Sequence, residues 1–387
     1  MKIKTFIKLG DICDISAGQG APQGDSNYCD NGTPFVKAGN LIELLQGKNE
    51  TDIQKVSEDV AKKHKLKKYT AGSILFAKSG MSCMKGYVYQ LKNDSYVVSH
   101  LAIVKPIKDS SDYIEYCLRH IKPNSLVKDE AYPSISLQDI SNLKIPLPSL
   151  EEQIKISKQL YICTQIINKH KKQLEKYDTL IKSRFIEMFG DPVLNPMGWE
   201  EVRITELCKN PDDIKCGPFG TQLSKDEYQK KGVPIFGIPQ INSSFRVLPT
   251  DFLTNSKAEK LDAYSLIYGD IAMSRKGNVG KCAIYSGKEK GIIHSDVVRL
   301  RVDDAICNSI YLMNQLHINQ KVETQISNVS SGAIMAGINV TKMKDIIVYN
   351  PPLSLQNDFA SFVQQIDKSK FEIANSLKRL YNKGMLS

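Results

Sequence analysis

The sequence predicts a protein of mixed α and β structure (α+β) in which two similar globular domains alternate with two long helices. The first observation is a repeat, because residues 71–80 (AGSILFAKSG) are echoed 197 positions later by residues 268–277 (YGDIAMSRKG). The second is that each copy passes from a stretch broken by Gly and Pro into an uninterrupted amphipathic run. A period this long excludes a solenoid, whose units have roughly 20–50 residues. We therefore expect one domain-plus-helix unit, present twice.

Each globular domain is predicted from short apolar runs that Gly and Pro separate. Such runs are typical of strands joined by turns, and a helical pattern appears near residues 113–119. We place the first domain at residues 1–149 and the second at 199–351. The expected strands include 73–77, 86–91 and 101–104 in the first domain, and 270–273, 281–285 and 297–300 in the second.

Two long helices are predicted, a central one at 150–190 and a C-terminal one at 352–387, with a hinge at 191–198. No Pro or Gly occurs from Glu151 to Phe189, and a mostly apolar heptad stripe recurs there at steps of three and four, ending at positions 184 (Arg) and 188 (Met). A heptad pattern of this length is typical of a coiled-coil helix of about 55–60 Å. Helices this long would overhang a single domain, so we expect antiparallel pairing rather than packing of each helix on its own domain only. The predicted interface residues are Ile156, Leu160, Ile167, Leu174, Ile181, Phe359, Val363, Ile366, Ile373 and Leu377.

Composition favours a cytoplasmic protein with a polyanionic partner. The chain of 387 residues has 52 Lys and Arg against 42 Asp and Glu, a formal net charge of +10. A basic balance suits nucleic acid. The 9 cysteines are scattered without Cys-x-x-Cys spacing, and the 6 histidines show no metal-ligand spacing, so we expect no metal. No apolar run reaches the length of a membrane span.

Two segments imitate catalytic motifs. Asn350-Pro351-Pro352 resembles the loop with which adenine methyltransferases hold a flipped base, but the next position should be aromatic and is Leu353. Residues 211–215 (PDDIK) have the acids and lysine of a metal-dependent nuclease, but a contiguous pentapeptide cannot converge them on Mg²⁺. No phosphate-binding loop occurs. We predict neither catalytic residues nor a cofactor, and a stand-alone adenine methyltransferase is the alternative.

Polar and basic loops flanked by glycine recur in both copies. Glycine permits close backbone approach, Lys and Arg meet phosphates or guanine edges, and Gln and Asn pair with adenine edges. Each residue alone could be part of a solvated turn, but recurrence at matched places favours DNA binding. The predicted DNA-binding residues are Gln19, Gln23, Lys37, Asn40, Lys78, Ser79, Lys85, Thr221, Gln222, Gln240, Arg275, Lys276, Asn278 and Lys281.

The helix boundaries resemble those of a known family. Residues 145–156 (IPLPSLEEQIKI) and 351–363 (PPLSLQNDFASFV) resemble the Pro-Leu-Gln signatures that open the helices of type I restriction-modification specificity subunits. Residues 184–192 (RFIEMFGDP) are similar to the family's exit from the central helix. The resemblance covers essentially the whole chain.

The resemblance implies a fold and a set of partners. Each globular domain would be a target-recognition domain that reads one half of a bipartite sequence in double-stranded DNA. The antiparallel helices would set the gap and dock two methyltransferase subunits, which restriction (translocase) subunits join. The specificity subunit itself would be non-catalytic and free of cofactor. Recognition domains vary within the family, so the resemblance supplies no base contacts, and a coiled-coil scaffold without a nucleic-acid role is a further alternative.

Overall fold

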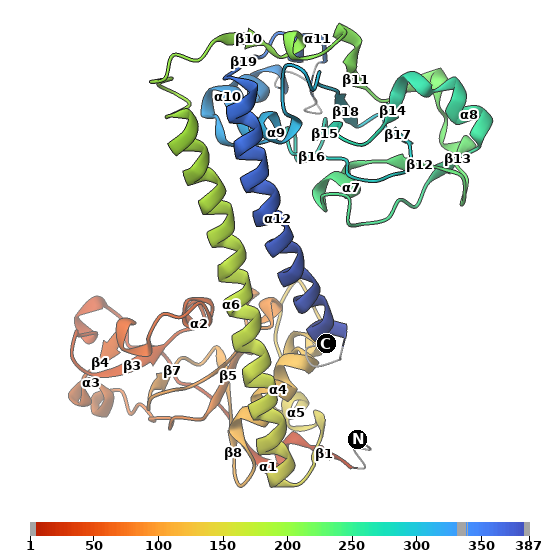
Figure 1. Cartoon of the computed structure of the whole chain (residues 1–387). Helices are drawn as coiled ribbons and strands as arrows, with labels where there is room; N and C mark the ends of the chain where they lie inside the picture. Colours follow the sequence, from red (N-terminus) through yellow and green to blue (C-terminus); the bar gives the residue numbers. More distant parts are fainter. Residues whose placement is uncertain (1–4, 331–337, 339, 383–387) are drawn as a thin grey trace. The chain divides into compact units, whose positions relative to one another are not determined.

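A computed structural model describes residues 5–330, 338 and 340–382 (Figure 1). The chain divides into two compact units, one drawn from residues 1–170 and 375–387 and the other from 171–374. Each unit contains one globular domain and parts of two long helices. In the described part of the chain, no helix is long and apolar enough to cross a membrane.

The globular domain of the first unit is built from three small sheets. The strand orders are β2-β8-β5-β6, β4-β3-β7 and β1-β9. Its apolar side chains form two clusters, one around Phe35 and Leu101 and the other around Ile74 and Ile114. The elements are β1 (Phe6–Lys8), α1 (Leu9–Ile12), β2 (Cys13–Ala17), β3 (Thr33–Val36), α2 (Asn40–Leu45), β4 (Lys55–Val56), α3 (Glu58–Lys63), β5 (Ile74–Ala77), β6 (Val88–Gln90), β7 (Tyr96–Val97), β8 (Leu101–Pro106), α4 (Ser111–Ile121), α5 (Leu137–Ser141) and β9 (Lys144–Pro146).

The globular domain of the second unit repeats every strand pairing of this plan and adds one strand. Its sheets have the orders β11-β18-β15-β16, β13-β12-β17-β14 and β10-β19, so the predicted internal repeat is confirmed. Strand β14 and helix α10 are additions of the second domain. The elements are β10 (Glu201–Arg203), β11 (Ile214–Cys216), β12 (Val233–Phe236), α7 (Ile238–Asn242), β13 (Phe252–Leu253), α8 (Asn255–Lys260), β14 (Ser265–Leu266), β15 (Ile271–Ser274), β16 (Cys282–Ile284), β17 (Gly291–Ile293), β18 (Val297–Leu300), α9 (Ser309–Ile318), α10 (Gln320–Ser330), α11 (Val340–Met343) and β19 (Ile347–Tyr349).

The two long helices, α6 (Leu150–Phe189) and α12 (Leu353–Asn382), pack antiparallel in the second unit (Figure 1). The end of α6 meets the start of α12, where the ring centroids of Phe185 and Phe359 are 5.5 Å apart. Farther along, Lys370 Nζ lies 2.6 Å from the carboxylate of Asp178, so sequence numbers rise along one helix as they fall along the other. The predicted antiparallel pairing is therefore present in this unit.

The buried stripe of α6 shifts at its C-terminal end. The expected stripe ran through Arg184 and Met188, but the fully buried side chains are Phe185 and Phe189. Both rings also contact Tyr311 of α9, because α6 here packs on its own domain as well as on α12. Of the predicted interface residues, Ile167, Ile181, Phe359, Val363 and Ile373 are buried, and Ile156, Leu160, Leu174, Ile366 and Leu377 are half-buried.

The glutamine of each Pro-Leu-Gln signature fastens a long helix to its domain. Gln153 Nε2 donates to the carbonyl of Pro148 (3.0 Å), and its Oε1 accepts from the N–H of Ser110 (3.0 Å) just before α4. Gln356 repeats this, donating to Pro351 (2.8 Å) and accepting from the N–H of Asn308 (2.8 Å) before α9. Both side chains are buried, which explains why this position is a glutamine.

We expect Gln356→Met to lower the free energy of unfolding of the second unit by about 2–4 kcal/mol. Methionine has a similar shape but leaves the half-buried N–H of Asn308 and the buried carbonyl of Pro351 without this partner. Gln365→Met, at an exposed position of the same helix, is the control and should change stability by less than about 0.5 kcal/mol. Denaturant unfolding measures both, and equal stabilities of the two variants would contradict the fastening role.

Candidate nucleic-acid interface

Strand ends meet at one edge of the first domain. In the sheet register Ala17, the last residue of β2, lies opposite Ala102, and Ala77, the last residue of β5, lies opposite Leu101. The loops that follow β2 and β5 therefore emerge beside the start of β8. The parallel strands β3 and β7 end at the same edge, since the N–H of Val98 donates to the carbonyl at the end of β3 (3.0 Å). We call this edge, formed by residues 18–23, 37–40, 78–87 and 98–100, the loop edge of the first domain.

The second domain has the equivalent loop edge. Ser274 at the end of β15 lies opposite Val297, and Phe236 at the end of β12 lies opposite Ile293 of the parallel strand β17. The N–H of Gly217, which follows β11, donates to the carbonyl of Val297 (3.0 Å). Residues 217–223, 237–240, 275–281 and 294–296 make up this edge. Both predicted sets of DNA-binding loops are thus gathered, each on one edge of its own domain.

The glycines after β2 and β11 serve the fold. A Cβ atom on Gly18 would lie 2.3 Å from the carbonyl oxygens of Val97 and Val98. On Gly217 it would lie 2.2 Å from the carbonyl oxygen of His294. Only glycine allows these strands to approach so closely. The close approach that the sequence suggested is to the protein's own backbone.

Two predicted contact residues close turns within the protein. Asn40 Oδ1 accepts from the N–H of Lys37 (2.9 Å), and Gln240 Oε1 accepts from the N–H of Gly237 (2.9 Å). Gln240 is only 5% exposed, and its Nε2 donates to the carbonyl of Leu248 (3.2 Å). Because its amide is buried and bonded at both ends within the turn, we do not retain Gln240 as a DNA contact.

Two others hold neighbouring segments in place. Gln19 Nε2 donates to the carbonyl of Lys65 (2.9 Å), and its Oε1 accepts from the N–H of Lys67. The guanidinium of Arg275 donates to the carbonyl of Ile338 (3.0 Å) and is half-buried. Both side chains therefore position neighbouring segments of the protein.

The remaining predicted residues present at least part of a polar side chain to solvent. Ser79 Oγ lies 2.8 Å from His100 Nδ1, and Lys276 Nζ lies 3.0 Å from Asp296. Lys37 Nζ donates to Gln54 Oε1 (2.6 Å). The exposed or half-exposed set is Gln23, Lys37, Lys78, Ser79, Lys85, Thr221, Gln222, Lys276, Asn278 and Lys281.

A basic segment that recurrence between the two copies does not reveal lies beside the first loop edge. Residues 62–68 (KKHKLKK) contain five lysines and a histidine, all exposed. The bonds from Gln19 join this segment to the end of β2. Local charge density, rather than repetition, is the sequence signal that would have revealed it.

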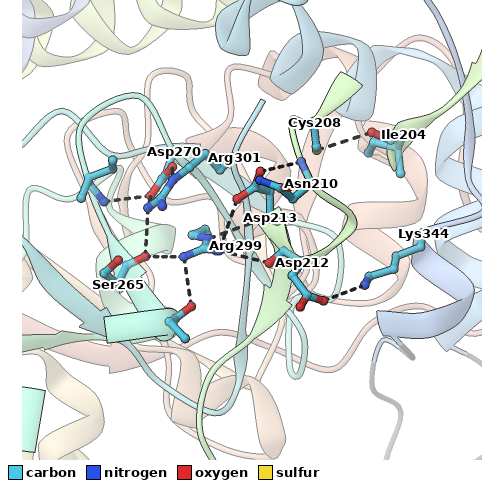
Figure 2. Close-up of polar contacts among 12 residues, drawn as sticks. Ile204, Cys208, Asn210, Asp212, Asp213, Ser265, Asp270, Arg299, Arg301 and Lys344 are labelled. Atoms are coloured by element: carbon cyan, nitrogen blue, oxygen red, sulfur yellow. Dashed lines mark hydrogen bonds and ion pairs between the residues drawn. The ribbon is translucent and has the colours of Figure 1, made fainter. Parts of the chain in front are cut away.

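The acids of residues 211–215 belong to a structural network that Figure 2 shows. Arg299, only 3% exposed, donates to the carbonyls of Asp212 (3.2 Å) and Ser265 (2.9 Å). Asp213 Oδ2 accepts from the N–H of Asn210 (3.0 Å) and so closes its own turn. Among residues 5–330, 338 and 340–382, no three His, Cys, Asp or Glu are grouped so that they could hold a metal ion.

A second arginine completes the network. Arg301 donates to both carboxylate oxygens of the buried Asp270, at 2.8 and 2.7 Å. These bonds raise the pKa of Arg301, whereas burial lowers the pKa of Arg299. Both guanidinium groups keep their charge at neutral pH, because an arginine side chain is not deprotonated in proteins. The network holds the loops before β11 and β14 against the central strands β15 and β18.

The side chains that resemble catalytic residues have structural roles or are buried. Asn350 Oδ1 accepts from the buried Gln356 Nε2 (3.1 Å), so this amide helps to fasten α12. Cys282 Sγ lies 3.2 Å from His317 Nε2, but burial raises the pKa of the thiol to about 12 and lowers that of His317. A thiolate nucleophile does not form under these conditions.

Comparisons with known proteins agree with this architecture. The family model described as type I restriction modification DNA specificity domain matches residues 1–176 and again 196–380. The putative type I restriction enzyme MjaX specificity subunit of Methanocaldococcus jannaschii is 25% identical over 353 residues, covering 84% of this chain and 79% of the relative. The MjaVIII specificity subunit of the same organism is 23% identical over 341 residues, covering 81% and 75%.

A solved structure shares the fold. The crystal structure of the type I restriction-modification system S subunit from M. genitalium superposes with a TM-score of 0.62 at 14% identity, covering 99% of this chain and 94% of that one. Two matches to one family model, together spanning most of the sequence, coincide with the two domain-plus-helix repeats. The chain belongs to the family of type I restriction-modification DNA specificity domains.

Proposed function

We propose that this chain is the DNA specificity subunit of a type I restriction-modification complex, and that each loop edge reads one half of a bipartite DNA sequence. The main support is that one strand order builds both edges while the side chains on them differ. The N–H of Lys78 donates to the carbonyl of His100, and the N–H of Arg275 donates to that of Asp296, which places these pairs at equivalent positions. A repeated scaffold with different side chains suits two different half-sites.

The polar loops suit duplex DNA in particular. Lysines such as Lys78 and Lys281 can neutralise phosphates, while amides such as those of Gln23 and Asn278 can pair with base edges in the major groove. The net charge of +10 supports attraction to the duplex. DNA in the cytoplasm would be the target.

The helices would act as spacer and docking site. In the first unit, α6 exposes a group of large apolar side chains, among them Ile154, Tyr161 and Ile162. Exposed apolar surface of this kind marks protein interfaces. It suits two methyltransferase subunits, which restriction subunits would join. Incubated alone with DNA and labelled S-adenosylmethionine, the chain should transfer no methyl group.

We expect Lys78→Gln and Lys276→Gln each to weaken binding of the full chain to duplex DNA. Each should also reduce the slope of log K against log salt by about 1, because one phosphate contact is lost. Lys105→Gln is the control, since Lys105 is exposed and lies opposite Asp14 in the register of β2 and β8, at the other end of the sheet. Fluorescence anisotropy across a salt series measures all three. Binding that ignores both loop substitutions would contradict the assignment of the loop edges.

A further inference from the structure

A tight turn presents a row of cations at the end of α3. Helix α3 ends at Lys63, and Lys65 adopts the left-handed conformation with φ of 51°. The N–H of Leu66 donates back to the carbonyl of Ala61 (2.8 Å), and the Leu66 side chain packs on the core. This is the helix-ending motif in which glycine usually occupies the left-handed position. We call Lys62, Lys63, His64, Lys65, Lys67 and Lys68 the lysine turn.

The lysine turn is fixed against the loop edge at two points. Both polar ends of the Gln19 side chain bind its backbone, one at the carbonyl of Lys65 and the other at the N–H of Lys67. The backbone of Gln19 in turn donates to the carbonyl of Val97 at the end of β7 (2.8 Å). These bonds therefore hold the lysines in a fixed position beside the loop edge of the first domain, where the proposed base contacts lie.

Acidic groups do not neutralise these cations. Within the part of the chain that the structure describes, no ion pair involves any lysine of the turn. Lys67 and Lys68 instead lie over the rings of Tyr69 and Tyr96, with Nζ 5.5 and 5.8 Å from the ring centroids. Unpaired cations beside a polar edge suit an external anion.

The equivalent segment of the second domain differs. Residues 58–69 contain five lysines and two acids, whereas residues 255–264 contain two lysines and two acids. Of these, Lys257 pairs with Glu227 (2.7 Å), and Asp262 pairs with Lys290. One lysine and one acid of this segment are therefore paired within the second domain, whereas the lysines of the turn have no such ion pair in the described part of the chain.

We propose that the lysine turn contacts the DNA phosphate backbone next to the half-site of the first domain, and so adds salt-dependent affinity that the equivalent segment of the second domain does not supply. The proposal rests on the DNA-binding function proposed above. Lysine ammonium groups act as point charges and discriminate little between bases, so this contact is independent of sequence. The two half-sites are then bound unequally even though the scaffold repeats.

The test compares two triple variants of the full chain on a random-sequence duplex of about 30 base pairs. One is Lys63→Gln, Lys67→Gln, Lys68→Gln. The matched control is Lys105→Gln, Lys108→Gln, Lys144→Gln, three exposed lysines at the opposite end of the same domain. The first should reduce the salt slope of binding by about 2–3, because each lost phosphate contact removes about 0.9. The control should change it by less than about 1.

Charge rescue separates the phosphate contact from a folding role. Lys63→Arg, Lys67→Arg, Lys68→Arg should keep the wild-type slope, and all variants should keep the wild-type melting temperature. Equal salt slopes for the two glutamine variants, or loss of binding in the arginine variant, would contradict the proposed phosphate contact of the lysine turn. Neither result would contradict DNA binding by the wild-type chain. Absence of salt-dependent binding by the wild-type chain would overturn the proposed function and the phosphate contact together.

Discussion

Arg299→Met is expected to lower the free energy of unfolding of the second domain by about 3–5 kcal/mol, since methionine removes every hydrogen bond of a buried guanidinium and the ion pair with Asp213. The guanidinium donates to the carbonyls of Asp212 (3.2 Å) before β11, Ala263 (3.3 Å) before β14, and Ser265 (2.9 Å) in β14. The Asp213 carboxylate, 3.9 Å away, would also lose its buried partner. Denaturant unfolding followed by circular dichroism measures the loss.

Arg203→Met is the matched control. Its side chain is 63% exposed and pairs with Asp345 at 3.6 Å, a surface ion pair worth less than about 1 kcal/mol. If the Arg299 variant proved as stable as this control, the network of Figure 2 would not be what holds these loops.

Phe359→Ala is expected to cost about 3–5 kcal/mol, the usual range for emptying a fully buried phenylalanine site. The ring meets Phe185 and Phe189 of α6 at 5.5 and 5.6 Å, so the cavity would open where the two long helices and α9 converge. Because this cluster sets the relative register of α6 and α12, the same variant should also loosen the spacer. Thermal and denaturant unfolding report the stability change.

Phe371→Ala on the same helix provides the comparison. Its side chain is 57% exposed, and its removal should change stability by less than about 1 kcal/mol. Similar costs for the two substitutions would mean that the aromatic cluster does not hold the helices.

The repeat and the helix boundaries could be predicted because they depend on local signals. Pro148 and Gly190 bracket the uninterrupted amphipathic run, and α6 begins at Leu150 and ends at Phe189. Segments that recur with the same Gly and Pro punctuation fold into the same strand order. Backbone punctuation and periodicity suffice for such features.

The polar interior could not be predicted, because its partners are distant in sequence. Arg299 interrupts an apolar strand, and the register places Ile103 at the equivalent position of the first domain. Nothing local indicates that an arginine there is buried, since its carbonyl partners come from residues 212–213 and 263–265. Gln240 shows the same limit in the candidate site, because an amide that closes a turn looks in sequence like an amide that reads a base.

Adenine methylation mapped across the genome of cells with and without this gene tests the central claim most directly. The proposed function predicts a gene-dependent motif made of two different half-sites separated by a fixed gap. Substitution of Asn278 together with Lys281 in the second loop edge should alter one half-site and leave the other unchanged. A single uninterrupted motif, or methylation that does not depend on the gene, would contradict the assignment of one half-site to each domain.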